Sequence, residues 1–273
     1  MSKELEDLIG KRFIQRTDVK AIQRGEIYTP HTDSGKRDGN RIGWDRQAIR
    51  DHIEGRVSYG HYLVDPDGQS KLFAFDIDLA KADPDNGKTF QWIGLEPDGS
   101  WSDMEPRTFD PREAWAHPKC PEPLKRFMTA CLTETAALLA KWIDELIQIP
   151  LAVAYSGSKG LHVYGFTGTA DAEDCRDAAI EVIEMQGLYE TIRGKCFYGP
   201  KDTSPKAMSS CVEIEIFPKQ TNLDGKDLGN LMRLPLGDNA KGGRSHFVTL
   251  SSVVDEMTEM DPVKALEGGN PWL

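Results

Sequence analysis

The sequence predicts an α+β fold built around an antiparallel sheet. Between residues 71 and 217 the spacing of apolar residues changes in the order strand, helix, strand, strand, helix, strand. This is the split βαβ order (βαββαβ) of ferredoxin-like and RNA-recognition (RRM) domains, whose two helices cover one face of the sheet and leave the other free for a site. We expect a main module over residues 61–250, an N-terminal α/β subdomain over 1–60 and a C-terminal tail over 251–273.

The first elements predict a helix followed by a hairpin. Apolar residues recur at helical spacing over residues 41–55, and Gly55 ends the pattern. Residues 57–64 and 71–79 have the composition of strands, and the Asp-Pro-Asp-Gly run at 65–68 between them is typical of a turn. We therefore expect these two strands to pair with each other.

The rest of the module alternates between helix and strand. Residues 80–121 are rich in Pro, Gly, Asp and Trp without a clear period, which predicts a long irregular insertion of the kind that is often functional. Beyond it, periodicity predicts a strong amphipathic helix and then, in order, two strands around a tight turn, a second helix and a last strand. Their expected ranges are 122–147, 151–155, 161–166, 171–185 and 211–217.

Four carboxylates stand two residues apart within apolar strands. Asp76 and Asp78 alternate with apolar residues in one strand, and Glu213 and Glu215 do so in the last strand. Because strand side chains alternate, each pair points to a single face. We expect these two strands to be antiparallel, on opposite sides of the other two, with all four carboxylates on the open face. The four are candidate catalytic residues of a site for two Mg²⁺ or Mn²⁺ ions, because these ions prefer oxygen ligands and relieve repulsion between carboxylates.

A glycine-bearing turn and two later cations are candidates for binding a nucleotide. Gly157 and Gly160 allow backbone N–H groups to point outward as a nest for phosphate oxygens, and the side chains around them add donors. A plainer interpretation is that such a turn needs no ligand and that the later cations only balance the two glutamates. The candidate residues are Ser156, Gly157, Ser158, Lys159, Gly160, His162, Lys219 and Arg233.

Composition limits the partners. The net charge of −11 counts against a protein that coats nucleic acid, although residues 1–60 carry twelve Lys and Arg against ten Asp and Glu, a balance of +2. Five scattered cysteines without a CxxC pair predict no zinc site, and the lack of an apolar leader or span predicts a soluble, cytoplasmic protein with no membrane partner. Candidates for contact with a single-stranded DNA template are Arg16, Lys20, Arg24, Arg37, Arg41 and Arg46.

Three motifs in order resemble those of the archaeo-eukaryotic primase superfamily. They are FAFDIDL, YSGSKGLHVY and VEIEIFPKQ, and the similarity spans roughly residues 16–237. The sequence looks closest to primase-polymerases of phages, mobile elements and TOTE-type conflict systems. The resemblance implies that the module 61–250 is a catalytic core that joins NTP or dNTP on a template with release of pyrophosphate, and that a helicase acts as a separate partner.

The resemblance also implies individual roles. Asp76 and Asp78 would bind the metal ions, with Glu215 favoured over Glu213 as the third ligand. Ser156, Ser158, Lys159 and His162 would hold the phosphates of the incoming nucleotide, assisted by Lys219 and Arg233. Two other functions remain open from the residues themselves: an RRM-like module that binds single strands without chemistry, and a metal-dependent phosphohydrolase.

Overall fold

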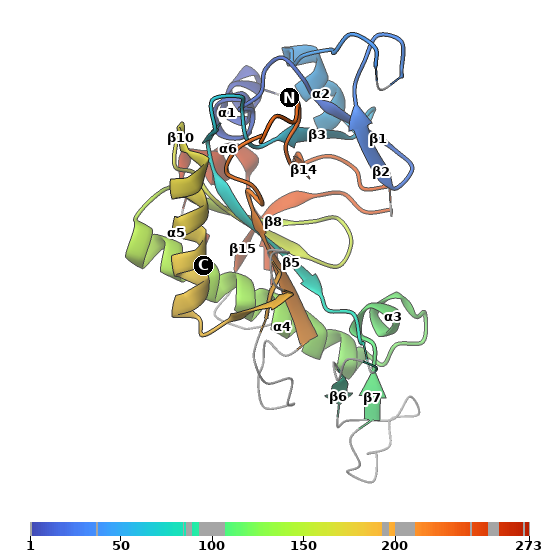
Figure 1. Cartoon of the computed structure of the whole chain (residues 1–273). Helices are drawn as coiled ribbons and strands as arrows, with labels where there is room; N and C mark the ends of the chain where they lie inside the picture. The colour runs from blue at the N-terminus through green and yellow to red at the C-terminus, as the bar shows by residue number, and fades with distance from the viewer. Residues whose placement is uncertain are drawn as a thin grey trace.

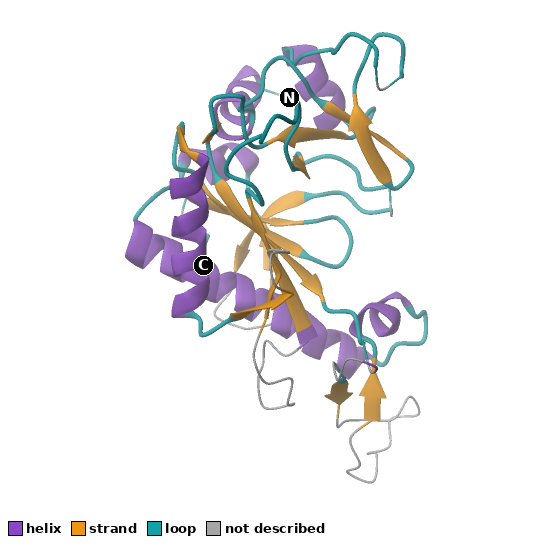
Figure 2. Cartoon of the chain, in the orientation of Figure 1, coloured by secondary structure: helices purple, strands orange, loops and turns teal. Residues whose placement is uncertain are grey.

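Helices and antiparallel strands are mixed along the chain, so the α+β class expected from the sequence is confirmed (Figure 2). The computed structural model describes residues 2–36, 38–83, 85, 89–92, 107–192, 197–199, 211–240, 242–250, 257–269 and 271–272. Within these residues, no helix combines the length and the apolarity that crossing a membrane requires.

An eight-stranded antiparallel sheet forms the centre of the molecule (Figure 1). Its order is β11-β12-β13-β5-β9-β8-β15-β16. The four middle strands follow the ranges expected from sequence: β5 (Phe73–Leu79), β8 (Leu151–Tyr155), β9 (Leu161–Gly165) and β13 (Val212–Phe217). The outer strands are β11 (Tyr189–Ile192), β12 (Phe197–Gly199), β15 (His246–Leu250) and β16 (Met257–Glu259).

Two helices cover one face of this sheet, as expected. They are α4 (Glu122–Trp142), which continues into the π-helical turn η2 (Ile143–Ile147), and α5 (Ala172–Met185). The larger hydrophobic core lies beneath them, and Phe75, Ile77 and Leu79 of β5 are fully buried in it. Because neighbouring strand residues face opposite ways, this burial turns Asp76 and Asp78 to the other face.

The other face is only partly free, which corrects the expectation of a wholly open face. Three helices, α1 (Lys3–Phe13), α2 (Arg46–Ile53) and α6 (Pro262–Glu267), contribute to a second core on this side. From the sheet, Ala74, Tyr164 and Phe217 are buried in this core. The apolar end of the face is thus covered, and the end that carries the carboxylates is left for a site.

A second, four-stranded sheet replaces the hairpin expected from 57–64 and 71–79, so that prediction was wrong. Its order is β14-β3-β1-β2. Gly60 of β3 favours the close pairing with β14, because a Cβ there would lie 3.0 Å from the carbonyl oxygen of Met232 and the strands would have to move apart slightly. The strands are β1 (Ala21–Arg24), β2 (Ile27–Pro30), β3 (Tyr59–Tyr62) and β14 (Leu231–Arg233).

Three other expectations change in detail. The helix expected over 41–55 begins only at Arg46, because the Asp45 side chain caps it by accepting from the Ala48 N–H (2.7 Å). The insertion at 80–121 is not wholly irregular, since it contains the paired strands β6 (Phe90–Trp92) and β7 (Arg107–Phe109) and the helix α3 (Pro111–Ala116). The tail carries β16 and α6, and the short strands β4 (Gln69–Ser70) and β10 (Ala170–Asp171) pair with each other.

Candidate active site

The two acidic strands are direct neighbours in the sheet. β13 pairs with β5 so that Glu215 is opposite Asp76 and Glu213 is opposite Asp78. The expectation that these strands lie on opposite sides of the other two was therefore wrong, because the last strand adds to the free edge of the first. The structure nevertheless brings all four carboxylates together on one face, as expected.

Each carboxylate has its own basic partner, and the partners come from three parts of the chain. The partners are His162 for Asp76 (Nε2 to Oδ1, 3.3 Å), Lys159 for Asp78 (Nζ to Oδ2, 3.3 Å), Arg112 for Glu213 (Nη2 to Oε2, 3.5 Å) and Lys219 for Glu215. Within the described residues, no three His, Cys, Asp or Glu side chains converge as a ready metal cluster. The carboxylates are thus balanced by basic groups in this arrangement, and a metal ion would have to draw them away from these partners.

The carboxylates influence one another's ionisation. Burial and the charge of Asp76 raise the pKa of Asp78, against the opposing effect of Lys159. Burial also acts to raise the pKa of Asp76, but His162 and other cations outweigh it, so that this pKa is lowered. Burial raises the pKa of Glu215 as well. Carboxylates that are costly to ionise together suit a divalent cation, which supplies the missing positive charge. The donor set therefore fits Mg²⁺ or Mn²⁺.

The turn between β8 and β9 is held in one conformation by its own residues. The Ser156 N–H donates to the Gly160 carbonyl (2.9 Å), and the Ser156 hydroxyl accepts from the Gly160 N–H (3.2 Å). Gly157 has φ +78°, and a Cβ at Gly160 would lie 2.5 Å from the backbone carbonyl oxygen of Ile77. Both glycines are therefore required, one by its backbone conformation and one by the close approach of the neighbouring strand.

His162 is held between a buried phenol and a carboxylate. Its Nδ1 is 2.8 Å from the hydroxyl of Tyr164, and its Nε2 faces Asp76. Tyr164 is fully buried, and this burial raises the pKa of its hydroxyl, which stays protonated. With the phenol donating to Nδ1, the other ring nitrogen can carry the hydrogen that points to Asp76.

Arg233 joins the second sheet to the turn. One of its guanidinium nitrogens (Nη2) donates to the carbonyl oxygen of Ser156, which also accepts from Asn239 Nδ2 at 3.4 Å. The other nitrogen, Nη1, is buried and has no hydrogen-bond partner among the described residues. Buried donors in proteins are nearly always satisfied, so this nitrogen is available for an anion.

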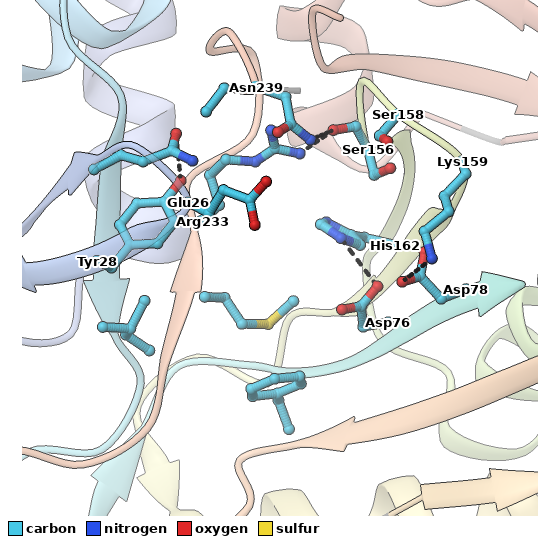
Figure 3. Close-up of a pocket in the computed structure, with 15 residues that line it drawn as sticks. Glu26, Tyr28, Asp76, Asp78, Ser156, Ser158, Lys159, His162, Arg233 and Asn239 are labelled. Carbon is cyan, nitrogen blue, oxygen red and sulfur yellow. Dashed lines mark hydrogen bonds and ion pairs between the residues drawn. The ribbon is translucent and has the colours of Figure 1, made fainter. Parts of the chain in front are cut away.

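A pocket of about 280 Å³ lies between the two sheets at this point (Figure 3). The main sheet contributes the carboxylates of β5, the turn and His162, and the second sheet contributes β14 and the β1–β2 hairpin. Sequence reasoning missed the hairpin side of the wall and Asn239, because these residues have no motif and meet the site only through tertiary packing. The lining residues are Gln23, Glu26, Tyr28, Asp76, Asp78, Ser156, Ser158, Lys159, His162, Phe217, Leu231, Met232, Arg233, Asn239 and Ala240.

Sequence reasoning also missed Arg112, which lies beside the carboxylates. It lies in α3, and Asp110 fixes this helix by accepting from the Arg112 N–H (2.8 Å) and from the Ala82 N–H (2.8 Å). The Arg112 Nε donates to the carbonyl of Leu79 (2.6 Å), which places the guanidinium beside Glu213. The insertion thus supplies a cation next to Glu213, at the edge of the group of four carboxylates.

The candidates for template contact are placed in different surroundings. Lys20 is buried, with its ammonium over Tyr59, and Arg16 is buried in an ion pair with Asp18. Two further candidates are also paired with acidic residues: Arg41 with Asp227, and Arg46 with Asp7. Arg24 is exposed at the end of β1, and Arg37 lies outside the described residues.

Comparison with known proteins adds no assignment. No protein-family model matches the chain, and a search of curated proteins finds no match. The fold and site define an α+β protein with a carboxylate-lined polar pocket between two antiparallel sheets.

Proposed function

We propose that this chain is a template-directed nucleotidyltransferase of the primase-polymerase kind. The observation that carries the proposal is a pocket in which Asp76 and Asp78 face the Ser-Gly-Ser-Lys turn, with Glu215 on the neighbouring strand (Figure 3). Carboxylates suited to divalent ions beside donors suited to phosphate are the two requirements of phosphoryl transfer to a hydroxyl.

The topology supports the same proposal. The middle strands lie in the order β13-β5-β9-β8, which is the order 4-1-3-2 of a ferredoxin-like βαββαβ module, with α4 and α5 on one face. This order places the first, third and last of the four strands side by side. Their open-face residues are Asp76, His162 and Glu215, the positions to which the three sequence motifs belong.

The chain's own residues would bind and orient the nucleotide. Lys159, Ser158 and Arg233 supply positive charge and hydrogen-bond donors for the phosphates. Asp76, Asp78 and Glu215 would hold the two divalent ions, which stabilise the charge on the attacking and leaving oxygens when bound. In the reaction a hydroxyl oxygen bonds to the α-phosphorus, the bond from that phosphorus to the bridging oxygen breaks, and pyrophosphate leaves while the hydroxyl proton passes to solvent.

The two alternative functions differ in what they require of the sheet. An RRM-like binding module stacks bases on aromatic side chains of its central strands, whereas the corresponding face here carries Asp76 and His162. A phosphohydrolase could use the same carboxylates and ions. It would transfer phosphate to water and would release inorganic phosphate without lengthening a primer.

The test is incorporation of labelled nucleotides on a single-stranded template, with and without a primer, in Mg²⁺ or Mn²⁺. We expect elongation or dinucleotide synthesis together with pyrophosphate release, abolished by chelation and by the double variant Asp76→Asn/Asp78→Asn. Asp67→Asn, which changes an exposed carboxylate in a turn, is the matched control and should retain activity. Incorporation that survives in the double variant, or phosphate release without elongation, would contradict the proposal.

A further inference from the structure

The pocket has two chemically different sides. The side formed by the main sheet carries Lys159, Ser158 and the carboxylates, whereas Glu26 and Tyr28 of the β1–β2 hairpin form the facing side (Figure 3). Phosphates are attracted to Lys159, Ser158 and Arg233 and would be attracted to divalent ions held by Asp76 and Asp78, whereas the Glu26 carboxylate repels them. A nucleotide therefore enters with its phosphates at the turn, and the next group along the molecule meets the hairpin.

The hairpin holds its polar groups at defined positions. Arg24 pairs with Ile27, so the turn has two central residues, Gly25 and Glu26, and Gly25 has the positive φ (+61°) that such a turn requires at its first central position. This tight turn places Glu26 at the tip, and Figure 3 shows its side chain extending into the pocket.

Tyr28 packs the β1–β2 hairpin against the neighbouring strand β3. Its hydroxyl lies 3.3 Å from Oε1 of Gln23 and 3.2 Å from Oγ of Ser58. Its ring packs over Gly60, where a Cβ would come within 3.2 Å of the ring. The hairpin that carries Glu26 is therefore fixed to β3.

Glu26 has the chemistry to accept hydrogen bonds from hydroxyl groups. An ionised carboxylate has two acceptor oxygens and no donor, which suits a pair of neighbouring sugar hydroxyls. The sugar of a nucleotide is bonded directly to the phosphates, so it is the part that lies next to the phosphate-binding turn in a pocket of about 280 Å³. Leu231 and Met232 also line the pocket, and apolar atoms there suit the carbon skeleton of the sugar.

We infer that Glu26 recognises the ribose hydroxyls of the incoming nucleotide and makes the chain selective for ribonucleotides over deoxyribonucleotides. This inference rests on the proposed nucleotide site. It assigns the sugar side of that site to the β1–β2 hairpin, a segment that none of the three motifs includes.

The experiment is calorimetric titration of the full chain with ATP and dATP in Mg²⁺, and again with GTP, CTP and UTP. Wild type should bind ATP about tenfold or more tightly than dATP, the effect expected of hydrogen bonds to a charged group. Glu26→Ala should reduce the affinity for ATP more than the affinity for dATP, which lacks the 2′-hydroxyl, and should remove most of the difference between the two. Ile27→Ala, the adjacent exposed residue that does not line the pocket, is the control and should behave as wild type.

Several outcomes would overturn the inference. Equal affinity of wild type for ATP and dATP would do so, as would an equal loss of both in Glu26→Ala. A loss confined to nucleotides whose bases carry an amino group would assign Glu26 to the base instead. Nucleotide binding with the expected preference but without incorporation would contradict the proposed transferase activity alone, whereas no binding of any nucleotide would contradict both.

Discussion

Glu215 lies directly opposite Asp76 across the β13–β5 pair, and His162 lies opposite Asp76 on the other side. Glu215, Asp76 and His162 therefore form one row across three strands. The next row outward contains Glu213 and Asp78, and its third position is Gly160, which has no side chain. The inner row thus has three polar side chains and borders the second core, whereas the outer row has two.

This arrangement predicts which glutamate acts as the third acid. Both glutamates have a basic partner, Arg112 for Glu213 and Lys219 for Glu215, but only Glu215 shares its row with Asp76 and His162. We expect Glu215→Gln to reduce nucleotide incorporation on the order of 100-fold or more, since a lost metal ligand costs several kcal/mol of charge stabilisation. The matched variant Glu213→Gln should stay within about tenfold of wild type. Equal losses, or the reverse order, would assign the third ligand to Glu213.

The turn that faces the carboxylates depends on close backbone packing. A Cβ at Gly157 would lie 2.8 Å from the carbonyl oxygen of Gly243, whereas one at Gly168 would meet nothing within 4 Å. Both glycines have positive φ, +78° and +73°. Gly157→Ala and Gly168→Ala should therefore share a conformational penalty of roughly 1 kcal/mol, and Gly157→Ala should lose more from the clash.

Denaturant unfolding and nucleotide titration of the two glycine variants check this prediction. Gly157→Ala should also weaken nucleotide binding, because the clash displaces the phosphate-binding turn. Gly168→Ala should bind as wild type does. If both variants show the same loss of stability and unchanged binding, the packing of the turn against Gly243 has no role in the site.

Local patterns were sufficient to predict the middle of the main sheet and its two helices. Alternation between apolar and polar residues marks β5 and β13, and in both strands the buried residues are the apolar ones. The same alternation predicts that Asp76 and Glu215 share a face, because side-chain direction in a strand is fixed by position. These features depend only on neighbours in sequence.

Local sequence patterns could not predict which strands pair with one another in the second sheet. The turn after β3 forms, with the Asp65 side chain accepting from the Gln69 N–H (2.9 Å), but the chain then passes to another sheet instead of folding back. The strands that β3 pairs with, β1 and β14, are distant in sequence, so their pairing is seen only in the folded chain. The helix α1 did have a local signal that was overlooked, since Leu5, Ile9 and Phe13 recur at helical spacing on its buried face.

Stability should fall in mildly acidic solution because His52 is buried in its neutral form. Its Nε2 lies 2.9 Å from the carbonyl oxygen of Leu234, and its Nδ1 accepts from the Tyr59 N–H (2.9 Å). Burial lowers the pKa of His52 to about 4. An unfolded histidine binds a proton near pH 6.5, so between these values the unfolded state holds more protons and the free energy of unfolding falls by about 1.4 kcal/mol per pH unit.

The measurement is urea unfolding at pH 7, 6 and 5 for wild type and His52→Gln. The variant should be less stable at pH 7, because it loses these hydrogen bonds, but its stability should fall less steeply with pH. His61, whose pKa burial lowers to about 3, contributes the same slope in both proteins, so the difference isolates His52. Identical slopes would mean that His52 is already protonated in the folded protein.

Contact with a template strand should depend more on Arg24 than on Arg46, although the two have the same side chain. Arg24 is exposed beside the hairpin that lines the pocket, whereas Arg46 is 2.6 Å from Asp7 and its charge is already balanced. Arg24→Gln should weaken binding of a labelled single-stranded oligonucleotide and reduce the slope of log affinity against log salt by about 0.7, the value for one lost phosphate contact. Arg46→Gln removes the same charge and should leave both quantities unchanged. Fluorescence anisotropy at several salt concentrations measures the two together, and equal effects of the two substitutions would indicate that net charge, rather than a contact at the hairpin, governs template binding.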